Sequence, residues 1–317
     1  MPIEYGGLLP SRRFGRHGDR VSIIGLGGGH LQRAEVPEEE SVRIIRAALD
    51  GGINFLDTAW CYGYGESERR IAKAIEGRRD GVFLMTKVCA RDRQAAAEQI
   101  DESLLRLRVD HVDLLQIHET NFDNDPDWVF EPGGAMEAVI AARKAGKTRY
   151  IGFTGHKSPH ILLRMLEMDF EWDSCQMPVN VMDGLFRSFE AEVLPELVRR
   201  GIACLGMKSL GGEGQFVSDA GIEAGVCRRY SLSRPIATLI CGARTMDDLR
   251  QDLEIGHSFE PLSAGEEARI RALIRRSATD GRHEWFKTTN YFDHAYHRAQ
   301  HGFPAHAEAR RTGPPSP

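Results

Sequence analysis

The sequence has few cysteines for its length, and no two of them are spaced as a metal or redox motif. Six cysteines are scattered over 317 residues, and none forms a C-x-x-C pair. Most lie within apolar stretches, where a free thiol packs as a small hydrophobic side chain. This pattern predicts reduced cysteines in a cytoplasmic protein, with no disulfide framework and no metal site.

Long hydrophobic runs and dense basic clusters are also missing. The longest apolar runs are well short of the roughly 18 residues that a membrane helix needs. The first residues lack the basic and apolar segments of a secretory signal. The net charge is −5, and no concentrated patch of Lys and Arg appears. We therefore expect neither a membrane nor a nucleic acid as partner.

The sequence does contain a regular alternation of short apolar runs and longer amphipathic segments. The apolar runs lie at 21–26, 54–59, 82–88, 112–118, 148–153, 174–179, 202–207 and 236–241. Nearly continuous hydrophobic runs of this length are typical of strands buried on both faces. Between them, residues 38–50 and 92–107 have the apolar periodicity of helices. Eight such alternating units predict a parallel (β/α)8 TIM barrel.

One barrel domain is expected to occupy the whole chain, 1–317, with additions at both ends. Residues 12–22 are expected to form a β-hairpin that caps the barrel floor, with its turn at Gly18-Asp19. The predicted divisions are a core at about 21–260, a C-terminal extension at about 261–305 and a flexible tail at 306–317.

A doubly wound nucleotide-binding sheet would show a similar alternation. Its signature would have to be the glycine-rich stretch from Gly25 to His30, where the histidine replaces the third glycine. A barrel with a glycine-rich first loop accounts for this stretch equally well.

Polar side chains end three successive strands of the predicted barrel. Asp57, Lys87 and His118 each stand at the end of an otherwise apolar run, and Tyr62 follows shortly after the first. Neighbouring strands lie about 4.8 Å apart, so the four side chains can converge at the catalytic end of a barrel. Taken singly, each residue also fits an ordinary ion pair, a core histidine or loop packing. Their order on consecutive strands favours chemistry.

The four groups together would make a proton donor. A Tyr hydroxyl has an ordinary pKa near 10, and a neighbouring lysine ammonium favours its ionised form. A carboxylate such as Asp57 would keep a buried lysine charged. A histidine could donate a hydrogen bond to a substrate oxygen. The group suits a carbonyl oxygen that gains negative charge when hydride reaches its carbon.

These residues also resemble a known family. The stretch from Gly52 to Gly63, with Asn54-Phe55-Leu56-Asp57-Thr58-Ala59 at its centre, resembles the first signature of the aldo/keto reductases. Thr86-Lys87 and Gln116-Ile117-His118 are similar to the strand ends that carry the rest of that family's Asp-Tyr-Lys-His tetrad. The resemblance extends from about residue 12 to about residue 259. It implies that Tyr62 is the general acid, that Lys87 lowers its pKa, and that His118 orients the carbonyl.

The resemblance also implies a nicotinamide cofactor. The expected contacts are Thr154, Gly155, Gln176, Met207, Lys208, Leu210, Gly211, Gly242, Arg244 and Asp248. Two positions depart from the usual family pattern. Thr154-Gly155 stands where relatives have Ser-Asn, and Met207 stands where most relatives have an aromatic ring.

The choice between NADP and NAD stays open at this stage. NADP is the cofactor usual for the family, and Arg244 could neutralise its 2′-phosphate. Asp248 would repel that phosphate and could instead accept a hydrogen bond from an unphosphorylated ribose, as NAD would offer.

The substrate is expected to be a small carbonyl compound of unidentified structure. Aromatic side chains expected to shape its pocket are Trp60, Phe122, Trp128 and Phe130. His294, His297 and His301 have helical spacing but no supporting motif, so a polar tail is favoured over a metal site. Because no cysteine follows Cys241, the C-terminal iron–sulfur module of some relatives is excluded.

Two other functions share these features. Regulatory subunits of potassium channels have the same fold and cofactor pocket, and sustained turnover would distinguish an enzyme from such a subunit. Schiff-base aldolases also place lysines inside barrels, but a carboxylate and a tyrosine beside Lys87 favour a charged amine. The sequence does not indicate the oligomeric state.

Overall fold

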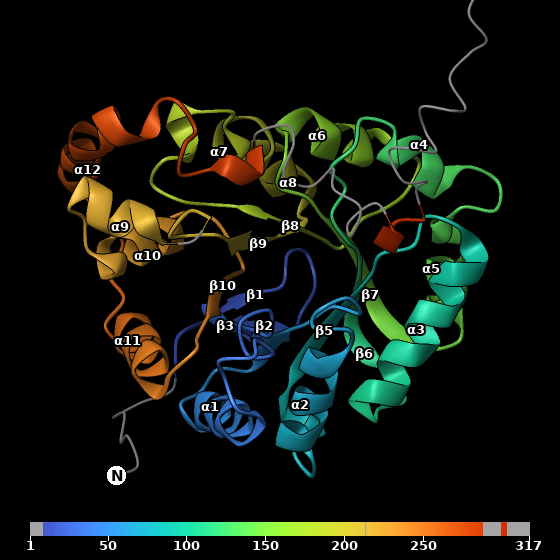
Figure 1. The fold of residues 1–317 in the computed structure, drawn as a ribbon. Helices are drawn as coiled ribbons and strands as arrows, with labels where there is room; N and C mark the ends of the chain where they lie inside the picture. Colours follow the sequence, from blue (N-terminus) through green and yellow to red (C-terminus); the bar gives the residue numbers. More distant parts are fainter. Residues whose placement is uncertain (1–8, 213, 288–298, 303–317) are drawn as a thin grey trace, which may run out of the picture.

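The computed structural model describes residues 9–212, 214–287 and 299–302 and contains a closed parallel barrel (Figure 1). Its strands are β3 (Ile24–Gly27), β4 (Phe55–Asp57), β5 (Phe83–Val88), β6 (Val112–Ile117), β7 (Thr148–Thr154), β8 (Ser174–Pro178), β9 (Ala203–Met207) and β10 (Thr238–Gly242). They are hydrogen-bonded in chain order, and β10 closes the barrel against β3. The (β/α)8 prediction is confirmed, and closure excludes the doubly wound alternative.

Helices connect the strands and surround the barrel (Figure 1). They are α1 (Glu38–Asp50), α2 (Glu66–Ile75), α3 (Arg93–Leu107), α4 (Asp125–Phe130), α5 (Ala135–Lys144), α6 (Pro159–Glu167), α7 (Phe189–Glu192), α8 (Leu194–Arg200), α9 (Gln215–Ala220), α10 (Ala224–Leu232), α11 (Met246–His257) and α12 (Ala264–Ala278). Single 3-10 turns are η1 (Arg79–Gly81), η2 (Asp183–Leu185) and η3 (Trp285–Lys287). The predicted helix at 38–50 coincides with α1, and the one at 92–107 with α3 and its N-cap Asp92, whose side chain accepts from the Ala95 N–H. In the described part of the chain, no helix has the length and apolar character needed to cross a bilayer.

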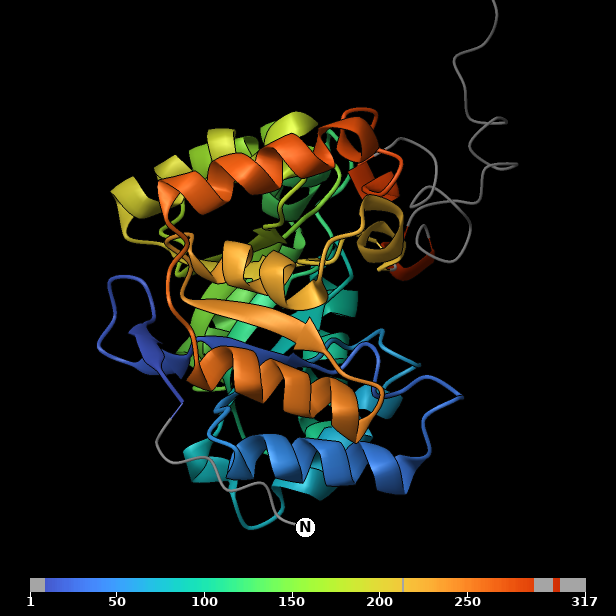
Figure 2. The ribbon, with the colours of Figure 1, turned by 90° about the vertical axis from the view of Figure 1, so that its left-hand side faces the viewer.

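An N-terminal hairpin closes the floor of the barrel. It consists of β1 (Ser11–Arg13) and β2 (Arg20–Ser22), paired antiparallel as predicted. Figure 2 shows it at the end of the barrel opposite to the one toward which β10 points. Phe14 from its loop is fully buried, with its ring centroid 4.9 Å from Phe83 and 5.1 Å from Tyr150. The prediction of a single first strand at 21–26 was wrong, because these residues are divided between β2 and β3.

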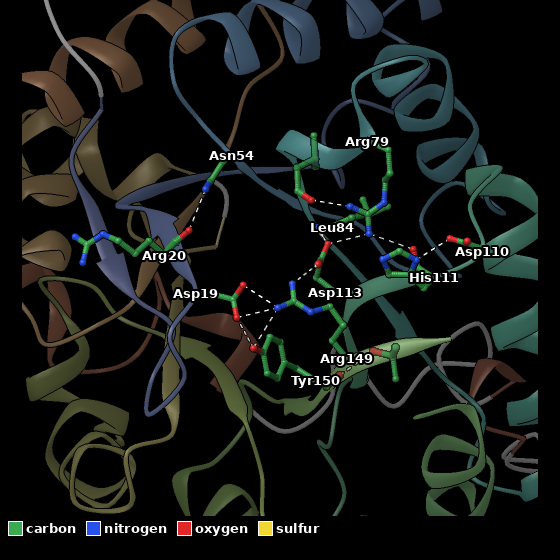
Figure 3. Close-up of polar contacts among 12 residues, drawn as sticks. Asp19, Arg20, Asn54, Arg79, Leu84, Asp110, His111, Asp113, Arg149 and Tyr150 are labelled. Atoms are coloured by element: carbon green, nitrogen blue, oxygen red, sulfur yellow. Dashed lines mark hydrogen bonds and ion pairs between the residues drawn. The ribbon is translucent and has the colours of Figure 1, made fainter. Parts of the chain in front are cut away.

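Ion pairs fasten this hairpin to the strands beneath it (Figure 3). Arg149 on β7 bonds Asp19 of the hairpin loop at 2.8 Å and Asp113 on β6 at 2.8 Å. Asp113 also accepts from Arg79 at 2.9 Å and from the Leu84 N–H at 2.8 Å. Every oxygen of the buried Asp113 carboxylate thus has a donor, which fits the structural role of this end of a barrel.

In the described part of the predicted C-terminal extension, α12 contacts α9. The turn η3 inserts Lys287, which is fully buried between Asp183 at 2.7 Å and Glu284 at 2.8 Å. The predicted flexible tail at 306–317 lies outside the described residues, as do His294 and His297.

Candidate active site

The four predicted catalytic side chains converge at the carboxyl ends of three adjacent strands. Asp57 is the last residue of β4, Lys87 is next to last on β5, and His118 directly follows β6. Tyr62 lies in the turn between β4 and α2. Because β4 pairs with β5 and β5 with β6, the end of each strand brings its side chain to the same rim.

Lys87 is the centre of this group. Its side chain is 1% exposed, and its ammonium forms an ion pair with Asp57. It also donates to the Thr58 carbonyl oxygen at 2.8 Å and to the Tyr62 hydroxyl oxygen at 3.3 Å. Asp57 accepts a second bond from the Gln176 amide at 2.8 Å. The lysine is thus charge-paired and placed beside the tyrosine oxygen.

The pKa of the Tyr62 hydroxyl is raised, whereas the charge of Lys87 alone would lower it. Burial raises this pKa well above its ordinary value, and the nearby Asp57 carboxylate raises it further. The ion pair with Asp57 offsets the charge of Lys87, so burial dominates. Without a bound ligand, Tyr62 is therefore held in its protonated form, which is the form that a general acid requires.

His118 is held from one side by two cysteines. Its Nδ1 atom lies 3.3 Å from Cys61 Sγ and 3.4 Å from Cys89 Sγ. Its ring meets the Tyr62 ring edge-on, with centroids 5.6 Å apart. Since Nδ1 takes these contacts, Nε2 is the ring atom left to bond a substrate oxygen. Burial raises the pKa of Cys89, but hydrogen bonding from Cys61 and the proximity of His118 lower it to about 5 overall.

A buried arginine, not identified from the sequence, positions the loops that carry these groups. Arg91 bonds the Cys89 carbonyl at 2.8 Å and the His118 carbonyl at 3.0 Å. Its charge is balanced by the fully buried Asp125, at 2.7 Å. Asp125 in turn accepts from the Phe122 N–H at 2.8 Å. Arg91 therefore ties the end of β5 to the end of β6.

A cleft of about 250 Å³ opens beside the tetrad and includes Asp57 and Tyr62. Of the predicted cofactor contacts, those that line it are Gln176, Met207, Lys208, Leu210, Gly211, Gly242 and Arg244. Three further lining residues, His30, Arg33 and Arg228, were not predicted. The glycine-rich loop after β3 contributes the first two, and that loop was the only sequence signal for them.

The cleft is rich in positive charge. Arg228 is paired with Asp252, whereas the guanidinium groups of Arg33 and Arg244 have no carboxylate partner among the described residues. Burial, together with the charges of Arg33 and Arg244, lowers the pKa of His30 to about 4. The cleft therefore favours an anionic ligand.

Gln176 carries an unmade hydrogen bond into this cleft. Its amide nitrogen must face the Asp57 carboxylate, which can only accept, and this fixes the position of its carbonyl oxygen. That oxygen is buried and has no partner within the described part of the chain. A ligand with an amide N–H would satisfy it.

Three predicted cofactor contacts do not line the cleft. Thr154 is buried, and its carbonyl accepts from the Thr120 N–H at 2.7 Å. At Gly155 an added Cβ would lie 2.6 Å from Leu162 Cδ2, so an asparagine has no room here. The carboxylate of Asp248 accepts from the Arg244 N–H at 2.8 Å and caps α11. The ribose contact predicted for Asp248 stays a prediction.

The predicted substrate-pocket aromatics also lie elsewhere. The lining of the cleft includes none of the four predicted rings, Trp60, Phe122, Trp128 and Phe130. Trp60 donates to Glu102 at 2.8 Å, and Phe130 packs edge-on against Trp172, with centroids 5.9 Å apart. Phe122 lines a separate hollow of about 640 Å³. The role of these four aromatic side chains in a substrate pocket stays a prediction.

Comparison with known sequences gives a family match. A profile described as "Aldo/keto reductase family" matches residues 23–225. The aldo-keto reductase YhdN of Bacillus subtilis is 37% identical over 193 residues, which are 56% of this chain and 55% of that protein. L-galactose dehydrogenase of Arabidopsis thaliana is 36% identical over 156 residues, 45% of this chain and 48% of that protein. The chain thus spans about half the length of these two relatives.

Solved structures share the fold. The aldo-keto reductase AKR11C1 from Bacillus halodurans in its holo form superposes with a TM-score of 0.71 at 22% identity, covering 87% of this chain and 99% of that one. An aldo/keto reductase from Klebsiella pneumoniae in complex with NADP and acetate gives a TM-score of 0.64 at 22% identity, covering 80% and 92%. At these identities the likeness concerns the fold alone.

Proposed function

The chain belongs to the aldo/keto reductase family, and from this premise we propose that it reduces an aldehyde or ketone to an alcohol with NADPH. One observation carries the proposal: a buried Lys87 joins the Asp57 carboxylate to the Tyr62 hydroxyl at the edge of a basic cleft.

The residues of the cleft fit a nicotinamide dinucleotide. The unpartnered Gln176 carbonyl oxygen suits the carboxamide N–H of a nicotinamide. Met207, with its polarizable thioether, lines the same cleft and can pack against the ring. Arg33, Lys208 and Arg244 supply positive charge for phosphates.

Two features favour NADPH over NADH. The guanidinium groups of Arg33 and Arg244 have no carboxylate partner in the described part of the chain, so they can bind a 2′-phosphate. The carboxylate that argued against this phosphate, Asp248, caps the N-terminus of α11, and the partial positive charge of that helix end partly offsets its own.

The side chains can then divide the proton chemistry among them. When bound, the reduced nicotinamide supplies hydride to the carbonyl carbon. Tyr62, held protonated by burial, donates its proton to the carbonyl oxygen as negative charge develops there. Lys87, 3.3 Å from the tyrosine oxygen, stabilises the phenolate that remains. Asp57 keeps this lysine charged, and His118 Nε2 orients the carbonyl oxygen.

The test compares Tyr62→Phe with Tyr64→Phe. Tyr64 is two residues away and 78% exposed, which makes it a matched control. Purified proteins would be titrated with NADPH and NADH by fluorescence and assayed against a panel of aldehydes and ketones. We expect Tyr62→Phe to bind NADPH like the wild type and to lose about 10²- to 10⁴-fold in kcat. Tyr64→Phe should keep its activity.

Two results would contradict the proposal. Failure of both cofactors to bind would remove its basis. Turnover of Tyr62→Phe at the wild-type rate would exclude this residue as the proton donor. Saturable binding without turnover on any carbonyl would point to a cofactor-binding regulatory subunit.

A further inference from the structure

Two cysteines lie next to His118 of the tetrad, and these three side chains are of types that bind metals, although no metal motif is present in the sequence. Cys61 comes from the turn after β4, Cys89 directly follows β5, and His118 directly follows β6. Their two Sγ atoms and the histidine nitrogen all lie within 4.8 Å of one another. Because each donor comes from a different loop, no sequence spacing could reveal the group.

The distances fit a tetrahedral ion. Zinc binds sulfur at about 2.3 Å and histidine nitrogen at about 2.0 Å, so neighbouring S and N ligands lie about 3.6 Å apart. The Nδ1 atom of His118 lies 3.3 Å from Cys61 Sγ and 3.4 Å from Cys89 Sγ. Both distances are within about 0.3 Å of that spacing.

The surroundings also suit a metal. The three residues are 7%, 0% and 4% exposed, so an ion here would lose most of its water and bind protein atoms instead. Arg91 fixes the backbone of two of the loops through the Cys89 and His118 carbonyls, which preorganises the donors. Two thiolates and a neutral imidazole would neutralise a divalent cation.

We propose that Cys61, Cys89 and His118 bind one Zn²⁺ ion through two sulfurs and Nδ1. Binding forms two Zn–S bonds and one Zn–N bond, and the two thiols release their protons to solvent. A Cys₂His set with a fourth position left for water is a known zinc arrangement, and thiolate ligands disfavour Mg²⁺ and Ca²⁺. The ion would tie the turn that carries Tyr62 to the ends of β5 and β6.

The experiment uses the full chain, reduced with a phosphine and stripped of metal by a chelator that is then removed. Titration with CoCl₂ reports thiolate coordination through charge-transfer absorption, and added ZnCl₂ should abolish that absorption by displacement. We expect one Co²⁺ per chain. Cys61→Ser and Cys89→Ser should each lose the absorption.

Cys204→Ser is the matched control. Cys204 is also a buried cysteine, but it lies on β9. This variant should keep the absorption, and the circular dichroism of all variants should show that they are folded. As a second measurement, ZnCl₂ should raise the melting temperature of the wild type and of Cys204→Ser, but not of Cys89→Ser.

Absence of charge-transfer absorption in the reduced wild type would overturn the proposal. So would equal absorption in Cys89→Ser, which would place the metal elsewhere. Failure of the reduced protein to take up metal, with a Cys61–Cys89 disulfide that forms once the reductant is removed and air is admitted, would also overturn it, in favour of a thiol pair. None of these readouts depends on carbonyl turnover, so they are independent of the proposed reductase activity.

Discussion

Replacing Asp57 by asparagine removes the negative charge beside the most buried cation of the site. Lys87 is 1% exposed and would keep only neutral acceptors, among them the Thr58 carbonyl at 2.8 Å and the Tyr62 hydroxyl at 3.3 Å. Breaking a buried pair by removing one partner costs about 3 to 5 kcal/mol. Because two neutral acceptors remain, we expect a loss near the lower limit, about 3 kcal/mol, in the free energy of unfolding.

Urea unfolding of a double-mutant cycle measures this loss. The cycle contains Asp57→Asn, Lys87→Met and the variant with both changes. The double variant should be more stable than Asp57→Asn, because no uncompensated charge remains in the barrel. Asp101→Asn is the control, since Asp101 and Lys147 form an exposed pair whose loss should cost less than about 1 kcal/mol. Additive single effects, or a cost of Asp57→Asn equal to the control's, would refute the reasoning.

Two further predictions concern pH and cofactor choice. Burial lowers the pKa of His156 from 6.5 to about 4, so this histidine is neutral in the folded protein. The contribution of neutral His156 to the free energy of unfolding is complete above pH 6.5. It is lost as the pH falls toward 4, by up to about 3 kcal/mol. His156→Gln should flatten this part of the stability curve, as measured by urea unfolding between pH 4.5 and 7.5; an unchanged slope would contradict the assignment. Arg244→Ala should weaken NADPH about tenfold and NADH much less, as measured by fluorescence titration, and equal weakening would exclude a 2′-phosphate contact.

The fold could be predicted because most barrel strands, β5 and β6 among them, are buried on both sides. The apolar runs at 82–88 and 112–118 therefore matched β5 and β6 within a residue at either end. The run at 21–26 failed as a single strand. Burial continues from β2 into β3, because Val21 and Ser22 at the end of β2 and all residues of β3 are buried.

The convergence of the four tetrad side chains could be predicted for a similar reason. Position along the chain fixes which strand a residue ends, and barrel closure fixes which strands are neighbours. Contacts between loops follow no such rule. Phe130 at the end of α4 packs against Trp172, and Asp248 in the first turn of α11 caps its own helix, so packing and capping at the helix ends determine where these side chains point. The approach of Cys61 to Cys89 depends in the same way on two separate loops.

Two buried polar groups at opposite ends of the barrel are satisfied differently. At the floor, both oxygens of the Asp113 carboxylate have donors, from Arg79 and Arg149. At the mouth, the Gln176 carbonyl oxygen is buried without a partner among the described residues, and Arg244 has no carboxylate there. A buried unmade hydrogen bond costs about 1 to 3 kcal/mol. A ligand that makes this bond removes the cost, so binding at the mouth should stabilise the barrel, whereas the floor holds its shape without one.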